Sequence, residues 1–126
     1  MAASFRDAVE AGDLEGMEAA LDRNVTFHSP VVFKPYEGRE AVMALLSLVA
    51  QVFEEFRYVD ELHGDGTTCL VFKARVGDRE LDGIDYLRHG QGGLVTELTV
   101  MVRPYSAATA LRDAMGARLE ALASGS

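Results

Sequence analysis

Residues 39–56 read REAVMALLSLVAQVFEEF, and this segment carries the strongest structural signal in the chain. Its apolar residues recur every three or four positions, which is the period of one buried face of an α-helix. They are Val42, Leu45, Leu46, Val49, Val52, Phe53 and Phe56. The spacing predicts a long helix over Arg39–Phe56 that packs into the core.

Four runs rich in β-branched and aromatic residues follow this helix, and they predict four strands. The strands are expected over Arg57–His63, Thr67–Val76, Glu80–His89 and Leu94–Arg103. The segments between them are short and rich in glycine, with Asp65, Asp78 and Gln91 beside the glycines. Because short turns join antiparallel strands, the pattern predicts an antiparallel meander.

The remaining segments complete an α+β pattern. Helices are expected over Ala3–Ala11 and Leu14–Leu21, followed by a strand from Val25 to Pro30, and an amphipathic helix over Ser106–Ala123 ends the chain. Helices and strands segregated in this way predict one domain over residues 1–126, with a strongly curved antiparallel sheet wrapped around the long helix. A twisted sheet closed by a helix leaves a hollow suited to a small ligand.

The charge composition of the chain disfavours two classes of binding partner. Twelve basic residues against twenty acidic ones give a net charge of −8, which disfavours nucleic acid and anionic membranes as partners. Cys69 is the single cysteine, no signal-peptide pattern is visible, and the apolar stretch over residues 41–53 is too short to cross a bilayer. We therefore expect a cytoplasmic protein.

Motifs for common cofactors and metals are missing from the sequence. It contains no GxxxxGK[ST] loop, no GxSxG elbow, no HExxH and no CxxC. His28, His63 and His89 fall on different expected elements, so nothing local joins them into a metal site. We expect neither a metal nor a cofactor.

Three segments resemble ketosteroid isomerases. They are FRDAVEAGDLEGM (residues 5–17), VTFHSP (residues 25–30) and GIDYLRHGQGGLVTEL (residues 83–98). The wider superfamily of nuclear-transport-factor-2-like proteins also includes SnoaL-like polyketide cyclases and limonene epoxide hydrolases. The resemblance implies a conical α+β barrel with an internal cavity.

The functional residues of these families match this chain only in part. Phe5 stands where the isomerases have an oxyanion-hole tyrosine, Ser29 stands in place of their general-base aspartate, and Asp85 matches their second aspartate. We therefore expect that the chain is not a standard ketosteroid isomerase and does not isomerise steroids by the same mechanism. The epoxide hydrolases would need an arginine at Gly83 and a carboxylate within Leu98–Arg103, and neither is present. SnoaL-like cyclases need one pocket aspartate as base, in a position comparable to Asp85.

Strand alternation places Gly83, Asp85 and Leu87 on one face of their strand. If that face lines the hollow, burial raises the pKa of Asp85. The alternative is that Asp85 points outward or pairs with an arginine such as Arg103. Tyr36, near the expected mouth, is a candidate hydroxyl donor. The other candidate ligand contacts are Phe5, Phe27, Ser29, Phe53, Phe72, Leu87, Leu98 and Val100.

Two classes of function remain open. The first is a cofactor-independent isomerase or cyclase that acts on a small apolar carbonyl compound, with Asp85 as acid or base. The second is a non-catalytic ligand-binding or scaffold protein. In either case we expect a homodimer through the outer face of the sheet, where alternation places Cys69, Val71, Thr99 and Met101.

Overall fold

The structure is a computed structural model that describes residues 4–124. Its elements confirm the α+β class. In chain order they are α1 (Phe5–Ala11), α2 (Leu14–Ala20), β1 (Leu21–His28), β2 (Tyr36–Glu37), α3 (Arg39–Val52), β3 (Glu54–Gly64), β4 (Thr67–Val76), β5 (Arg79–His89), the short 3-10 turn η1 (Gln91–Gly93), β6 (Val95–Arg103) and α4 (Tyr105–Ser124).

The six strands form one sheet in the order β2-β1-β6-β5-β4-β3. The hairpins from β3 to β6 are antiparallel, as the short turns predicted. The expectation of a wholly antiparallel sheet is wrong, because β1 pairs in parallel with β6. No short turn fixes the direction of β1, since α3 and the meander separate the two strands and leave enough chain for a parallel crossover. The sheet is also open, with β2 and β3 at its edges.

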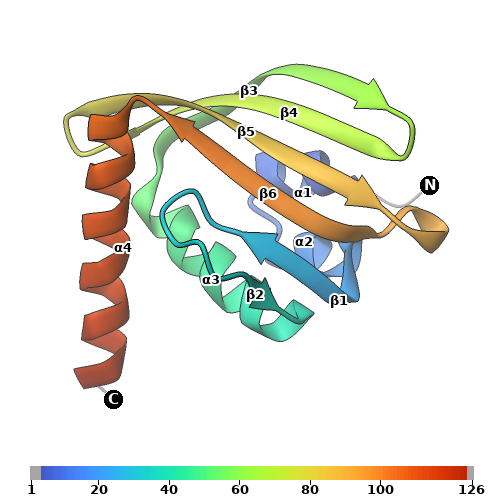
Figure 1. Ribbon diagram of the computed structural model, residues 1–126, viewed down its shortest axis with the longest axis horizontal. Coiled ribbons are helices and arrows are strands. Elements are labelled where there is room, and N and C mark those ends of the chain that lie inside the picture. The colour runs from blue at the N-terminus through green and yellow to red at the C-terminus, as the bar shows by residue number, and fades with distance from the viewer. Residues whose placement is uncertain (1–3, 125–126) are drawn as a thin grey trace.

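The helices cover the sheet from one side (Figure 1). In this view α1 and α2 lie behind the sheet, α3 packs beside β1 and β2, and α4 stands at one end of the sheet, where it contacts α3 and strands β4 to β6. The core lies between these layers, with Phe72, Leu70, Leu98, Val25 and Val42 almost completely inaccessible to solvent. Among the described residues, no helix is long and apolar enough to cross a membrane.

The boundary between α3 and β3 differs from the expectation. The helix ends at Val52, and Phe53 and Phe56 belong to the extended chain that follows. A bulge between Glu54 and Arg57, with Glu55 at a positive φ of 55°, shifts the register of β3 against β4. The rings of Phe53 and Phe56 then stack, with centroids 5.7 Å apart. Both side chains therefore face inward, as their helical spacing predicted, but the bulge in β3 and not a helix gives them this direction.

Local signals set the two N-terminal helices. Ser4 and Asp7 form a capping box at the start of α1, and Gly12 ends that helix in the left-handed conformation, with φ of 67°. Asp13 caps α2 by accepting the N–H of Gly16. Leu21, expected at the end of α2, begins β1 instead. The expected helical residue Ala3 lies outside the described residues.

Candidate functional site

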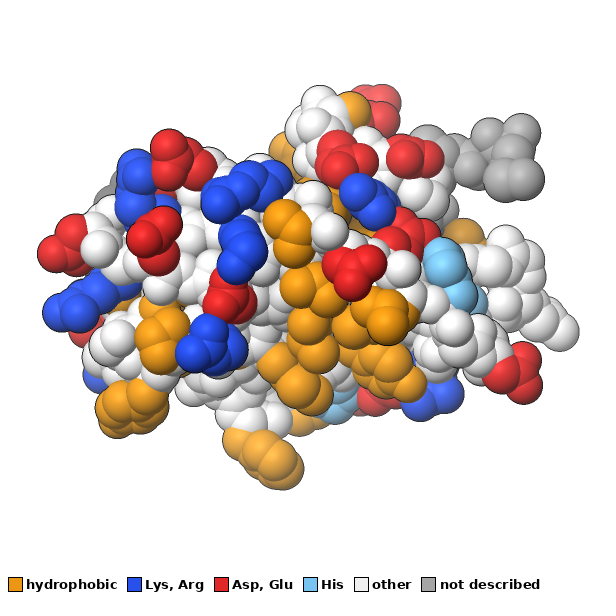
Figure 2. All heavy atoms as spheres, turned by 90° about the horizontal axis from the view of Figure 1, so that it is seen from above, with side chains coloured by type: hydrophobic (Ala, Val, Ile, Leu, Met, Phe, Trp, Pro, Cys, Tyr) orange, Lys and Arg blue, Asp and Glu red, His pale blue; other side chains and the backbone are white. Residues whose placement is uncertain are grey.

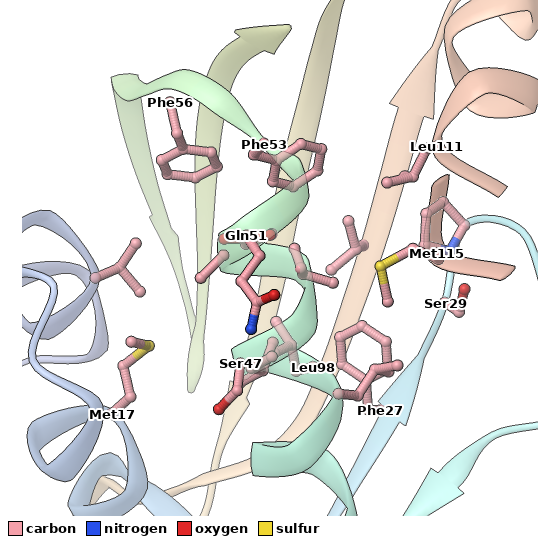
Figure 3. A pocket seen from close by; sticks show the side chains of 18 of the residues that line it. Met17, Phe27, Ser29, Ser47, Gln51, Phe53, Phe56, Leu98, Leu111 and Met115 are labelled. Atoms are coloured by element: carbon pink, nitrogen blue, oxygen red, sulfur yellow. The ribbon is translucent and has the colours of Figure 1, made fainter. Parts of the chain in front are cut away.

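A pocket of about 930 Å³ lies between the inner face of the sheet and the helices. Its wall is mainly apolar and comes from helices α1, α2, α3 and α4, from strands β1, β2, β3, β5 and β6, and from the loop after β1. In Figure 3, Met17 lies on one side of α3, while Phe27, Leu111 and Met115 lie on the other. The pocket therefore extends along both flanks of this helix.

Asp85 is a charged group in the wall of this pocket. Burial alternates along β5, and Leu81, Gly83, Asp85 and Leu87 occupy its inner face. The Asp85 side chain is buried, and its Oδ2 accepts a hydrogen bond of 2.7 Å from the hydroxyl of Tyr58 on β3. Arg103 does not supply a partner, because its guanidinium pairs with Asp82 at 2.7 Å on the opposite face of the sheet.

Burial and the hydrogen bond from Tyr58 shift the pKa of Asp85 in opposite directions. Desolvation disfavours the carboxylate and raises the pKa of Asp85 to about 6, although the Tyr58 hydroxyl partly offsets this shift by stabilising the charge. The same burial, together with the neighbouring carboxylate, raises the pKa of Tyr58 well above its usual value. At neutral pH the site thus holds a largely ionised Asp85 and a protonated Tyr58 donor.

Helix α1 also contacts the Tyr58 ring, through the side chain of Arg6. The Arg6 guanidinium lies over this ring, 5.6 Å from its centroid, which is within cation–π range. Arg6 is itself held by Glu61 at 2.8 Å and by Glu10 at 3.4 Å. The position of the Tyr58 hydroxyl therefore depends on contacts from both β3 and α1.

Most of the ligand contacts expected from the sequence lie in the pocket wall, namely Phe5, Phe27, Ser29, Tyr36, Phe53, Leu98 and Val100. The Ser29 hydroxyl accepts the N–H of Val31 at 3.1 Å and so shapes the loop after β1. Tyr36 belongs to the short strand β2 and lies edge-on to Phe27.

Phe72 and Leu87 differ from this expectation, because they lie in the packed core behind the wall. The Phe72 ring fills the space over Gly83, where even a Cβ atom would collide with it. Phe53 and Phe56 cover the same ring from the pocket side. Leu87 lies further along β5, in register with Thr68 and Leu98, and is almost fully buried.

Sequence analysis missed Tyr58, which is the hydrogen-bond partner of Asp85. The helical period assigns Phe56 to the end of the long helix, and this assignment hides the alternation of Phe56 and Tyr58 along one strand. Had residues 54–58 been read as a strand, this spacing of two would have placed both side chains on one face. Leu111 and Met115 of α4 also line the pocket, whereas the sequence analysis places no residue of the C-terminal helix there.

The sequence matches the SnoaL-like domain over residues 2–102. The chain belongs to the SnoaL-like domain family. This SnoaL-like protein is accordingly a member of the nuclear-transport-factor-2-like superfamily, as the resemblance implied. The matched segment contains Asp85 and Tyr58 but ends before α4. No curated protein matches the sequence of this SnoaL-like protein.

Solved structures give the same fold. A steroid delta-isomerase from Pseudomonas aeruginosa is 41% identical, with a TM-score of 0.87 over 91% of this chain and 85% of that one. An uncharacterised bacterial protein with a cystatin-like fold from Silicibacter pomeroyi is 37% identical, with a TM-score of 0.87 over 92% and 82% of the two chains. A Catenulispora acidiphila protein with a ketosteroid isomerase-like fold is 11% identical, with a TM-score of 0.64 over 86% and 88%, and is similar in fold alone.

Proposed function

We propose that this SnoaL-like protein binds a small apolar carbonyl compound in the pocket and that Asp85 moves a proton on it. The observation that carries the proposal is the buried Asp85–Tyr58 pair in an apolar wall. A carboxyl whose pKa is about 6 is near the best value for a general base at neutral pH. The similarity to a steroid delta-isomerase of Pseudomonas aeruginosa supports the same class of chemistry.

In the proposed reaction, the Asp85 carboxylate takes a proton from the carbon next to the carbonyl group. Tyr58 holds Oδ2 of Asp85, so the substrate meets the other carboxylate oxygen. Isomerisation then returns the proton to a different carbon, whereas cyclisation uses the enolate as the carbon nucleophile. Neither reaction needs a cofactor. The conical enclosure of the ligand by the sheet and α3 is part of this proposal.

The test uses β-tetralone, a small apolar ketone with acidic protons next to its carbonyl group. In heavy water, the protein should accelerate exchange of these protons for deuterium, as followed by proton NMR. Asp85→Asn should abolish the acceleration, because an amide cannot act as the base. Ketone binding without Asp85-dependent exchange would contradict the catalytic proposal and favour non-catalytic ligand binding.

We also propose that two copies pair through the outer face of the sheet. Register brings together the rows Met101–Ile84–Val71 and Tyr86–Cys69–Leu62 on this face. Figure 2, which looks onto the sheet from above, shows a continuous group of hydrophobic side chains bordered by charged ones. Met101 and Leu62 are more than half exposed, at 54% and 53%. A patch of this kind is usually covered by a partner.

Light scattering at micromolar concentration tests the dimer. The wild-type protein should give twice the chain mass of 13.7 kDa, and Met101→Lys should give a monomer, because it places a charge within the apolar patch. Leu122→Lys is the matched control, since it charges an exposed leucine on α4, away from the sheet face. A wild-type mass of 13.7 kDa would rule out the dimer.

The cytoplasm remains the proposed compartment. Its support is the lone thiol, Cys69, which has no second cysteine in this chain to pair with and therefore needs no oxidising environment.

A further inference from the structure

Helix α4 lines one part of the pocket with a row of apolar side chains. Leu111 and Met115 are buried, while Leu119 lies nearer the surface and is 43% exposed. All three line the pocket, and a helix rises by about 12 Å over the eight residues that separate the first from the last. Pro30, Val31 and Val32, in the loop after β1, line the same pocket. This part of the pocket is therefore long and apolar.

Gly116 interrupts the side chains of the α4 wall. It lines the pocket, and a Cβ atom built on it would meet no atom within 4 Å. Its backbone is regular α-helix, so the position does not require glycine for conformational reasons. In a helix interior glycine is less favourable than alanine. The glycine keeps space open at this point of the wall, against its helical preference.

The charges along α4 indicate what could occupy that space. Arg112 also lines the pocket, but its side chain is 59% exposed and its guanidinium lies 3.3 Å from the Asp113 carboxylate. Arg118 lies further along α4 and donates to the backbone carbonyl of Gln51 at the end of α3. The α4 side of the pocket therefore suits an apolar group better than an acidic one.

We propose that the ligand is an amphiphile whose polar end lies at Asp85 and whose apolar tail extends along α4 against Gly116. The position of Gly116 then determines the longest tail that the pocket accepts. The inference rests on the proposed function, because it uses Asp85 as the polar end. It goes further in assigning a specificity-determining residue to α4, which lies outside the segment that matches the family.

The test compares two phenols, whose hydroxyl group can donate to the Asp85 carboxylate. In the wild-type protein, para-octylphenol should bind more tightly than para-ethylphenol, by up to about fourfold for each additional buried methylene. Gly116→Leu should weaken para-octylphenol at least tenfold and leave para-ethylphenol within twofold. Isothermal titration calorimetry measures both affinities in each variant.

Ala117→Leu is the matched control, since it adds a leucine at the adjacent, solvent-exposed position of α4. It should leave both affinities unchanged. Equal affinities of the two phenols for the wild-type protein, or equal weakening of both by Gly116→Leu, would overturn the tail assignment. The β-tetralone exchange does not need a tail, so its Asp85 dependence shows separately whether the proposed function holds.

Discussion

Asp85→Asn is expected to stabilise the protein at pH 8 by about 3 kcal/mol, while abolishing proton exchange on β-tetralone. The pKa of Asp85 is raised from 3.8 to about 6 in the folded state, so the folded protein binds this proton more tightly than the unfolded chain does. The stability that this tighter proton binding contributes is fully present below the pKa that Asp85 has in the unfolded chain. It is lost as the pH rises through the folded pKa, and the penalty is complete by pH 8. An asparagine avoids this penalty, and its amide oxygen can still accept from Tyr58.

Urea denaturation of both proteins at pH 4 and pH 8 measures this effect. The advantage of the variant should be small at pH 4, where the carboxyl is protonated in the folded protein. Asp82→Asn provides a control of opposite sign on the same strand. Lys73 and Arg103 lower the pKa of Asp82, so its carboxylate contributes stability that is present at pH 8 and lost in acid. If Asp85→Asn also lowered stability at pH 8, Asp85 would be an ionised structural partner and not a pocket base.

Tyr58→Phe is expected to have the second-largest effect and to act in the opposite direction at pH 8. It removes the hydroxyl that donates to a buried carboxylate, and such a bond contributes about 2 kcal/mol. Because the hydrogen bond lowers the pKa of Asp85, its loss should raise that pKa above about 6. The destabilisation should therefore be greatest at pH 8 and small at pH 4, where Asp85 is already neutral.

An NMR titration of the Asp85 carboxyl carbon measures the pKa, and the pH profile of β-tetralone exchange should move upward with it. Tyr86→Phe is the matched control, because Tyr86 is the next residue along β5 and faces the other side of the sheet. An Asp85 pKa that is the same in wild-type and Tyr58→Phe proteins would mean that the 2.7 Å contact does not stabilise the charge.

Much of the fold follows from local chemistry that the sequence displays. The apolar period after Arg39 predicted α3, and the turns between the later strands predicted the meander. Strand alternation placed Asp85 on the same face as Gly83, as the structure has it. Each of these features depends on residues close together in the chain, whose spacing determines which way their side chains point.

The features that escaped prediction depend on contacts between distant segments. The parallel pairing of β1 with β6 joins strands that no short turn connects. The bulge at Glu55 is held by partners elsewhere in the chain, since Arg75 pairs with the carboxylates of Glu54 and Glu55 and the Glu54 carboxylate also accepts the N–H of Gly77. The sequence does not display this bulge, so its apolar period assigns Phe56 to a helix and indicates no face for Tyr58. Of the two residues in the Asp85–Tyr58 pair, only Asp85 could therefore be predicted from the sequence.

The bulged register of β3 also determines where the chain tolerates insertions and deletions. Tyr58 and Asp85 lie on two strands that both pair with β4, so two hairpin registers together place the hydroxyl against the carboxylate. Additional residues in the turns at 65–66 or 77–78 would leave both registers intact. A single residue gained or lost between Glu54 and Tyr58 would turn the tyrosine to the other face of the sheet. The site therefore tolerates insertions and deletions at the tips of the hairpins, but it does not tolerate them within the first five residues of β3.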